Sequence, residues 1–324
     1  MIRRGFTLIE IMVSILIFTV VALAMMTIML MASNIYRSGE AGRSANDEAV
    51  AVMAALDEDL SRMVPSAGGG WFYADLDSNS GNTTIAFRIA RRDRSQIDRL
   101  GDGDRAIVVW WLKPQVVGGV AQNILCRGEQ PAQLLDDDPN TNQDFTTLQQ
   151  IKAGQHAEVT SGCLHFGAYL ASNAGARNLA REWMTEMKGN DTLPNDASAL
   201  DTTGQPFPVA IRITTVLTGG GRFAARGRLV RDISPSDTTI RIVGIPTLST
   251  APGSMVKISP PSDPSNGEWI GYRAYTNGQL DCSGGSSTDP LVGRGLRRSV
   301  KATFLPQSLV EIGQSYSLVR TLPR

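Results

Sequence analysis

The feature that most constrains this chain is an apolar run close to its first residue. Every residue from 6 to 32 is apolar or a small hydroxyl residue except Glu10. A transmembrane helix needs about 20 mainly apolar residues, and residues 11–32 supply them without Glu10. Arg3 and Arg4 precede the run, so the positive-inside rule keeps the first residues cytoplasmic and places the bulk of the chain beyond the membrane.

A secretory signal peptide is the alternative interpretation of the same segment. Ala22-Leu23-Ala24 has the small residues of a cleavage site and lies behind a basic start and an apolar core. However, the apolar run continues past that site to Met31, and a carboxylate lies inside the supposed core. These two features favour a single membrane-spanning helix.

Glu10 needs a partner or a task, because a charged group at membrane depth costs roughly 2.5 to 3.5 kcal/mol on insertion scales. A cut after Gly5 would create a positively charged amine at Phe6. Glu10 of one subunit could neutralise that amine on another when helices pack into a bundle. The acid would then fix the alignment of the helices, as a buried polar residue does in a coiled coil.

At these residues the sequence resembles the class III signal of type IV pilins and type II secretion pseudopilins. Gly5, Phe6 and Glu10 match the family's positions, and Thr7-Leu8-Ile9 fits the pattern between them. The resemblance implies that prepilin peptidase cuts after Gly5, that Phe6 becomes N-methylated and that Glu10 serves subunit assembly. It rests on about the first 35 residues.

Helical periodicity continues beyond the apolar run and predicts one helix over residues 6–63. Apolar residues recur at steps of three and four, and charged residues take the other face. The apolar set is Ala45, Ala49, Val52, Met53, Leu56, Leu60 and Met63, and the charged set is Arg43, Asp47, Glu48, Asp57 and Asp59. Gly39 and Gly42 predict a bend or a melted segment, since each weakens a helix by about 1 kcal/mol. Pro65 and the glycines at 68–70 predict its end.

The rest of the chain predicts an α+β fold in which the long helix packs on an antiparallel β-sheet head. Alternating or β-rich segments predict strands at 83–90, 106–112, 209–217, 238–243, 268–275 and 315–320. A second helix is predicted at residues 165–188, where apolar residues are spaced for one face. Residues 136–150 and 189–205 are polar and predict loops.

Short strand patterns around Gly and Pro turns set residues 222–306 apart as an inserted β-rich module. The module is similar in type to small β modules of some surface-appendage and phage-tail proteins, and no ligand follows from this. The expected organisation is a leader at 1–5, the transmembrane and assembly helix at 6–64, a globular pilin head at 65–221, the module at 222–306, and a C-terminal strand of the head at 307–324.

Three cysteines are expected on the oxidising side of the membrane, where disulfides persist. Cys126 and Cys163 are the favoured pair because both lie in the same central region, and Cys282 is left over; the sequence does not fix the connectivity. Many type IV pilins close a C-terminal loop with a disulfide, and this chain has no obvious equivalent, which argues against a major pilin.

Catalytic and metal-binding motifs are scarce, so no enzyme activity, metal or cofactor is predicted. His156, Glu158, Cys163 and His165 cluster in sequence, but their spacing fits no standard zinc site. Asp75, Asp77 and Asn79 alternate like the first ligands of a calcium loop. Gly81 comes one place late and Ala86 stands where a bidentate acid is needed, so a solvated turn is the alternative.

Arginine-rich stretches raise the question of nucleic-acid binding. The first set is Arg88, Arg91, Arg92, Arg94 and Arg99, and the second is Arg222, Arg226, Arg228 and Arg231. Asp93, Asp98 and Asp232 dilute both sets, and the chain as a whole has 31 basic and 31 acidic residues. Charged strand edges that oppose aggregation are the favoured interpretation, and no nucleic-acid partner is predicted.

The resemblance implies a structural subunit of a type IV pilus, most similar to the large minor pilins of the PilW family. Such a subunit waits in the inner membrane with its head in the periplasm and then joins the pilus fibre at the cell surface. The implied partners are prepilin peptidase, the major pilin, other minor pilins and a tip protein. The alternatives are a J-like minor pseudopilin of a type II secretion system and a tip adhesin or DNA-binding minor pilin.

Overall fold

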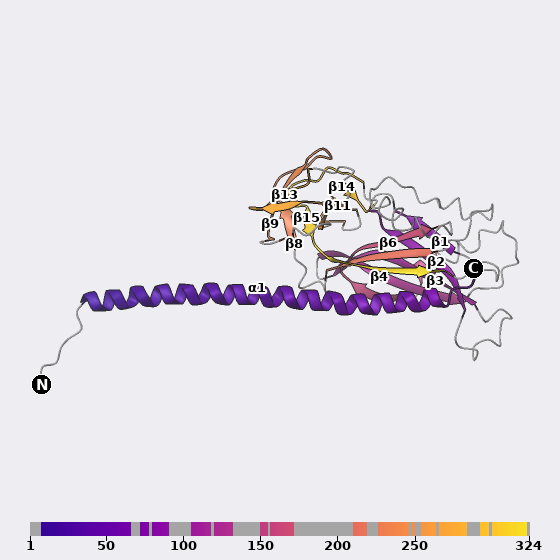
Figure 1. The fold of residues 1–324 in the computed structure, drawn as a ribbon, viewed down its shortest axis with the longest axis horizontal. Coiled ribbons are helices and arrows are strands. Elements are labelled where there is room, and N and C mark those ends of the chain that lie inside the picture. The colour runs from indigo at the N-terminus through magenta and orange to yellow at the C-terminus, as the bar shows by residue number, and fades with distance from the viewer. Residues whose placement is uncertain are drawn as a thin grey trace, which may run out of the picture.

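The computed structural model shows a long N-terminal helix followed by antiparallel sheets, an α+β arrangement of the pilin-like kind (Figure 1). The structure describes residues 8–65, 72–77, 80–90, 105–117, 120–131, 150–154, 156–171, 210–218, 226–245, 248–249, 254–263, 266–283, 292–297 and 300–322. Within these residues the strands form sheets of five, eight and three strands.

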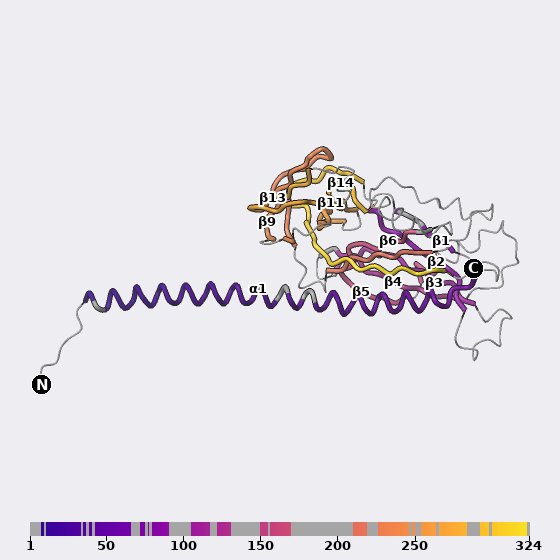
Figure 2. The backbone as a smooth tube through the Cα atoms, viewed as in Figure 1, coloured from indigo at the N-terminus to yellow at the C-terminus, as the bar shows by residue number. Residues whose placement is uncertain are grey.

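Helix α1 (Leu8–Ser61) is a single element of 54 residues and is about 80 Å long at 1.5 Å per residue. The bend predicted at Gly39 and Gly42 is wrong, because the helix passes through both positions without a break (Figure 2). Two glycines cost about 2 kcal/mol together, and a helix that is already nucleated on both sides continues through them.

The five-stranded sheet is antiparallel throughout, in the order β1-β2-β3-β4-β5. Its side chains alternate between two faces. Ile85, Phe87 and Trp110 point into one buried cluster, and Ala86, Val109 and Cys126 point into another on the opposite face. Its strands are β1 (Phe72–Leu76), β2 (Thr83–Ala90), β3 (Arg105–Val117), β4 (Val120–Pro131) and β5 (Ala157–Ser161).

The three-stranded sheet has the order β16-β7-β6, formed by β6 (Cys163–Ala171), β7 (Ala210–Leu217) and β16 (Gln314–Thr321). The second helix predicted at 165–188 is wrong over residues 165–171, which form β6; the rest of it lies outside the described residues. Strand β6 is buried on both faces and therefore lacks the polar alternation that marks a half-exposed strand.

The main core lies where one face of each of these two sheets meets α1. From Ala45 onward the helix buries a stripe that packs against β16, β7 and β5. The stripe is Ala45, Ala49, Val52, Leu56 and Leu60, and Met63 continues it just past the end of the helix. We call residues 45–61 the packed half of α1, and we call these two sheets together with the packed half the head.

The eight-stranded sheet has its own buried cluster and the order β12-β13-β9-β8-β15-β10-β11-β14. All of its strands come between β7 and β16 in the chain. We propose that this sheet is an inserted module, and we use that name for it below. It extends past the expected boundary at 306, because β15 pairs with β8 and β10. Its strands are β8 (Arg226–Leu229), β9 (Thr239–Val243), β10 (Met255–Ser259), β11 (Glu268–Gly271), β12 (Ala274–Thr276), β13 (Gln279–Asp281), β14 (Gly293–Leu296) and β15 (Leu309–Glu311).

The inserted module packs on the outer face of the three-stranded sheet. Leu164 and Val216 of the head form a buried cluster with Trp269 and Leu296 of the module, and we call this contact the junction. Lys257 of the module is fully buried, and its Nζ donates to the carbonyl of Leu164 at 3.0 Å. Burial lowers the pKa of Lys257.

Candidate assembly helix and head sites

The first half of α1 is apolar and has no protein packed against it. Residues Ile11–Ser33 have a mean hydropathy of 2.7, and none of this segment is buried. Its length and composition suit a bilayer. We call this segment the apolar half of α1.

Two threonine hydroxyls in the apolar half are satisfied inside the helix. Thr19 Oγ1 donates to the carbonyl of Ile15 at 2.8 Å, and Thr27 Oγ1 donates to the carbonyl of Leu23 at 2.9 Å. Such bonds hide polar groups from a hydrocarbon environment, where an unsatisfied group is costly. The apolar half is therefore chemically suited to lipid or to contact with other apolar helices.

The residues predicted for processing and assembly lie at the edge of what the structure describes. Gly5 and Phe6 fall outside the described residues. Glu10 lies in the first turns of α1, and its side chain is not among those described. Their roles in cleavage, methylation and assembly stay predictions.

The packed half ends in a polar clamp centred on Asp59, which is only 1% exposed. Its carboxylate accepts hydrogen bonds from Arg127 Nε at 2.7 Å and from Arg127 Nη2 at 2.8 Å. Arg62 Nη2 at 2.8 Å and Trp110 Nε1 at 2.9 Å also donate to it. The hydrogen bond to Asp59 is the main reason why the pKa of Arg127 is raised. This clamp joins the end of α1 to β3 and β4.

Asp59 is predicted on the charged face of the helix, and the structure corrects this. Asp59 lies on the core side beside Leu56 and Leu60. Its spacing in the sequence could have indicated this burial, because Asp59 follows Leu56 by three residues and so falls on the apolar stripe. A carboxylate at such a position needs a buried cation, and Arg127 was not identified as its partner.

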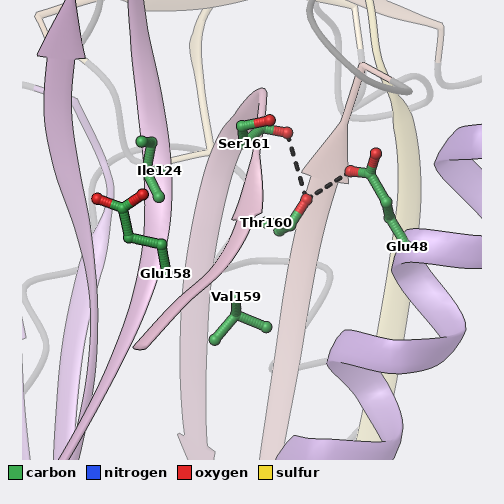
Figure 3. Close-up of a pocket in the computed structure, with 6 residues that line it drawn as sticks. All are labelled: Glu48, Ile124, Glu158, Val159, Thr160 and Ser161. Atoms are coloured by element: carbon green, nitrogen blue, oxygen red, sulfur yellow. Dashed lines mark hydrogen bonds between the residues drawn. The ribbon is translucent and has the colours of Figure 1, made fainter. Parts of the chain in front are cut away.

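A recess of about 340 Å³ lies between α1 and β5, lined by Glu48, Ile124, Glu158, Val159, Thr160 and Ser161 (Figure 3). Thr160 Oγ1 donates to Glu48 Oε2 at 2.5 Å, and Ser44 Oγ donates to Glu48 Oε1 at 3.3 Å. Glu48 thus ties the helix to an edge strand. The recess presents the carboxylates of Glu48 and Glu158 and the hydroxyls of Thr160 and Ser161.

Of the residues considered for calcium, Asp77 lies in the turn between β1 and β2. The carbonyl of Asp77 accepts from the Gly81 N–H at 2.8 Å, and its carboxylate accepts from Ser80 Oγ at 2.5 Å. Gly81 has a φ of +71°, which glycine adopts without strain. Asp75 lies in β1, its side chain is not described, and Asn79 is outside the described residues.

The four residues considered for zinc are not brought together. The ring of His156 stacks edge-on against Trp111, and its Nε2 lies 3.2 Å from Lys113 Nζ. His165 is buried under the module, with Nδ1 3.2 Å from Asn82 Oδ1. Within the described part of the chain, no group of three or more His, Cys, Asp or Glu side chains could hold a metal ion.

All three cysteines are described, and all are free and buried, so the disulfide predicted between Cys126 and Cys163 is absent. The reason is the sheet itself. Cys126 points into the cluster on one face of the five-stranded sheet, and Cys163 belongs to the main core on the other. Burial raises the pKa of Cys126 to about 11, and it raises those of Cys163 and Cys282 to about 12. These thiols are therefore poor nucleophiles.

Most of the arginines considered for nucleic-acid binding lie outside the described residues, namely Arg91, Arg92, Arg94, Arg99 and Arg222. Arg226 forms an ion pair with Glu311 at 3.0 Å, and Arg228 donates to Gln307 at 3.2 Å. Their charges serve contacts within the eight-stranded sheet.

Comparison with known proteins gives one match, and it falls on the start of the chain. The family model described as the prokaryotic N-terminal methylation motif matches residues 1–26. No curated protein and no solved structure matches the chain. The motif and the uncovered apolar half together support a type IV pilin-like prepilin that is processed by prepilin peptidase and associates with the membrane.

Proposed function

We propose that this chain is a minor pilin that takes part in priming or tip assembly of a type IV pilus. The observation that carries the proposal is the division of α1. Its apolar half is uncovered and follows a methylation motif, and its packed half is built into the core of the head. A chain of this design is a structural subunit that brings a folded head to an assembly of helices.

Processing prepares the helix for assembly. In our proposal the leader is removed after Gly5, and the new N-terminal amine of Phe6 is methylated. The helix waits in the inner membrane with its head in the periplasm. Glu10 then pairs with the amine of a neighbouring subunit, and apolar contacts among the helices replace contacts with lipid as the subunit enters the fibre.

The inserted module favours a minor pilin of the large, PilW-like kind over a J-like pseudopilin of a type II secretion system. Secretion pseudopilins usually have smaller and plainer heads, whereas this head carries an additional eight-stranded sheet. A module at the surface of a head also suits contacts with a tip protein. A tip adhesin would be compatible with this role.

The test is an in-frame deletion of the gene, with measurement of major pilin sheared from the cell surface. We expect a loss of surface pilin, while the cellular pool of major pilin stays intact and complementation restores the fibres. Unchanged pili would refute the priming role, and a secretion defect in the same strain would identify a pseudopilin.

The role of Glu10 is tested separately in the complemented strain. We expect Glu10→Ala to be processed normally but to be recovered at least tenfold less in sheared fibres, because the amine of the neighbour loses its partner. Glu40→Ala, a carboxylate of the same helix outside the membrane segment, is the matched control and should assemble normally. Gly5→Arg provides the unprocessed reference on immunoblots. Normal assembly of Glu10→Ala would refute the pairing of acid and amine.

A further inference from the structure

Two buried arginines at the end of β14 differ in how their charges are satisfied. Arg294 is 9% exposed and forms a two-pronged pair with Glu268, with Nε to Oε1 and Nη2 to Oε2 both at 2.6 Å. Its Nη1 also donates to the carbonyl of Ser234 at 2.6 Å, and its Nη2 to that of Ala302 at 2.8 Å. Each nitrogen of Arg294 therefore has an acceptor.

Arg297, three residues further on, is more deeply buried, and fewer of its guanidinium nitrogens have hydrogen-bond acceptors. It is 4% exposed, and its Nη2 donates to Ser315 Oγ at 3.0 Å. Its guanidinium carbon lies 5.2 Å from the ring centre of Trp269. Nε and Nη1 are buried and have no acceptor among the described residues. Arg297 also has a left-handed backbone, with φ at 50°, a conformation that is uncommon outside glycine.

The surface beneath Arg297 is the outer face of the three-stranded sheet at the junction. Pairing across β6 and β7 places Tyr169 opposite Arg212, and the next outward residue of β7 is Thr214. Thr214 is 1% exposed, and its Oγ1 has no partner among the described residues. This face therefore presents a second guanidinium and buried hydroxyl groups to the same region.

No carboxylate among the described residues is paired with Arg297. Burial lowers its pKa most, Tyr169 raises it, and the neighbouring charge of Arg212 lowers it. Burying an unpaired guanidinium is expensive, and a second positive charge nearby adds to the cost. Arg294 shows that the module can supply a carboxylate to a buried arginine, so the missing partner at Arg297 calls for an explanation.

We propose that the junction is an oxyanion-binding site, in which a small phosphate or carboxylate ion accepts hydrogen bonds from Arg297 Nε, Arg297 Nη1 and Thr214 Oγ1. The charge of the ion neutralises Arg297. Arginine suits such ligands because its planar N–H groups match their oxygens. Since Arg297 belongs to the module and Thr214 to the head, the bound ion joins the two.

The binding test uses the full chain in detergent micelles. Thermal unfolding is followed while inorganic phosphate, acetate or chloride is added at constant ionic strength. We expect a saturable rise in Tm with phosphate or acetate, about 5 °C at a hundredfold excess over the dissociation constant, and no saturable rise with chloride. A response to phosphate alone would identify the ligand as a phosphate, and a response to acetate would identify a carboxylate.

Variants assign the effect to the junction. Arg297→Gln should abolish the saturable rise, whereas Arg273→Gln, an exposed arginine of the module paired with Asp281, should retain it. Thr214→Val should weaken binding about tenfold without removing a charge. If Arg297→Gln fails to fold, the Thr214→Val variant tests the proposal in its place. Equilibrium dialysis with labelled phosphate should give one ion per chain. No saturable response to either oxyanion, or an unchanged response in both variants, would overturn the proposal.

Discussion

The two halves of α1 have the same backbone and opposite environments. Residues 11–33 leave their apolar side chains exposed, and residues 45–61 bury an apolar stripe in the main core. The packed half also carries polar contacts that a helix in lipid would not tolerate, chiefly the clamp at Asp59. The head therefore stabilises the packed half of α1 and leaves the apolar half for a different environment.

The largest expected effect in the packed half is the loss of its buried carboxylate. Asp59→Ala should lower the free energy of unfolding by about 3 to 5 kcal/mol, because the part-buried Arg127 would lose its main partner and the buried Trp110 Nε1 would lose its acceptor. Urea unfolding of the full chain in detergent, followed by tryptophan fluorescence, measures this. Asp47→Ala is the matched control, since Asp47 is exposed and lies 3.9 Å from Arg43; it should change stability by less than about 0.5 kcal/mol. Equal effects of the two variants would contradict the clamp.

A pair of leucine truncations compares the two halves directly. Leu56 is fully buried, and Leu16 is 65% exposed. Leu56→Ala should cost about 2 to 5 kcal/mol through lost burial and the cavity left behind. Leu16→Ala should leave the stability of the head unchanged in the same urea measurement. Destabilisation by Leu16→Ala would mean that the apolar half contacts the head in solution.

The smallest effect concerns the stretch that joins the halves. A methyl group added at Gly39 meets nothing within 4 Å, so Gly39→Ala should stabilise the helix locally by about 0.5 to 1 kcal/mol. Amide hydrogen exchange around this residue should slow about two- to fivefold. Ala51→Gly, at an exposed position of the packed half, should change exchange in the opposite sense. Faster exchange in Gly39→Ala would show that the helix needs glycine at position 39.

Alternating polarity and β-rich composition predicted several strands well. Strands β2, β7 and β16 match the predicted ranges 83–90, 209–217 and 315–320 to within one residue at each end. Strand β7 keeps the alternation of Ile211, Arg212 and Ile213 although nearly all of it is buried. Strand β6 was mistaken for a helix because both of its faces are covered. Segment 268–275 divides into β11 and β12 with a break between them.

The sites were harder to predict because they depend on contacts between distant parts of the chain. The motif at Gly5, Phe6 and Glu10 is local and could be identified by its resemblance to the prepilin signal. The clamp between Asp59 and Arg127 joins residues 68 positions apart. The disulfide expected between Cys126 and Cys163 failed for the same reason, since sequence proximity says nothing about which face of a sheet a thiol occupies.

The position of α1 beside the head has a mechanical consequence. The helix runs along the strands of the head, side by side with them (Figure 1). Tension applied to the apolar half therefore acts along the plane of contact and loads the buried stripe in shear. All of its contacts must slide together before the helix can leave, whereas a perpendicular pull would separate them one after another. Forced detachment is governed by the unfolding rate. This orientation therefore makes the head resist the extraction of α1 under tension.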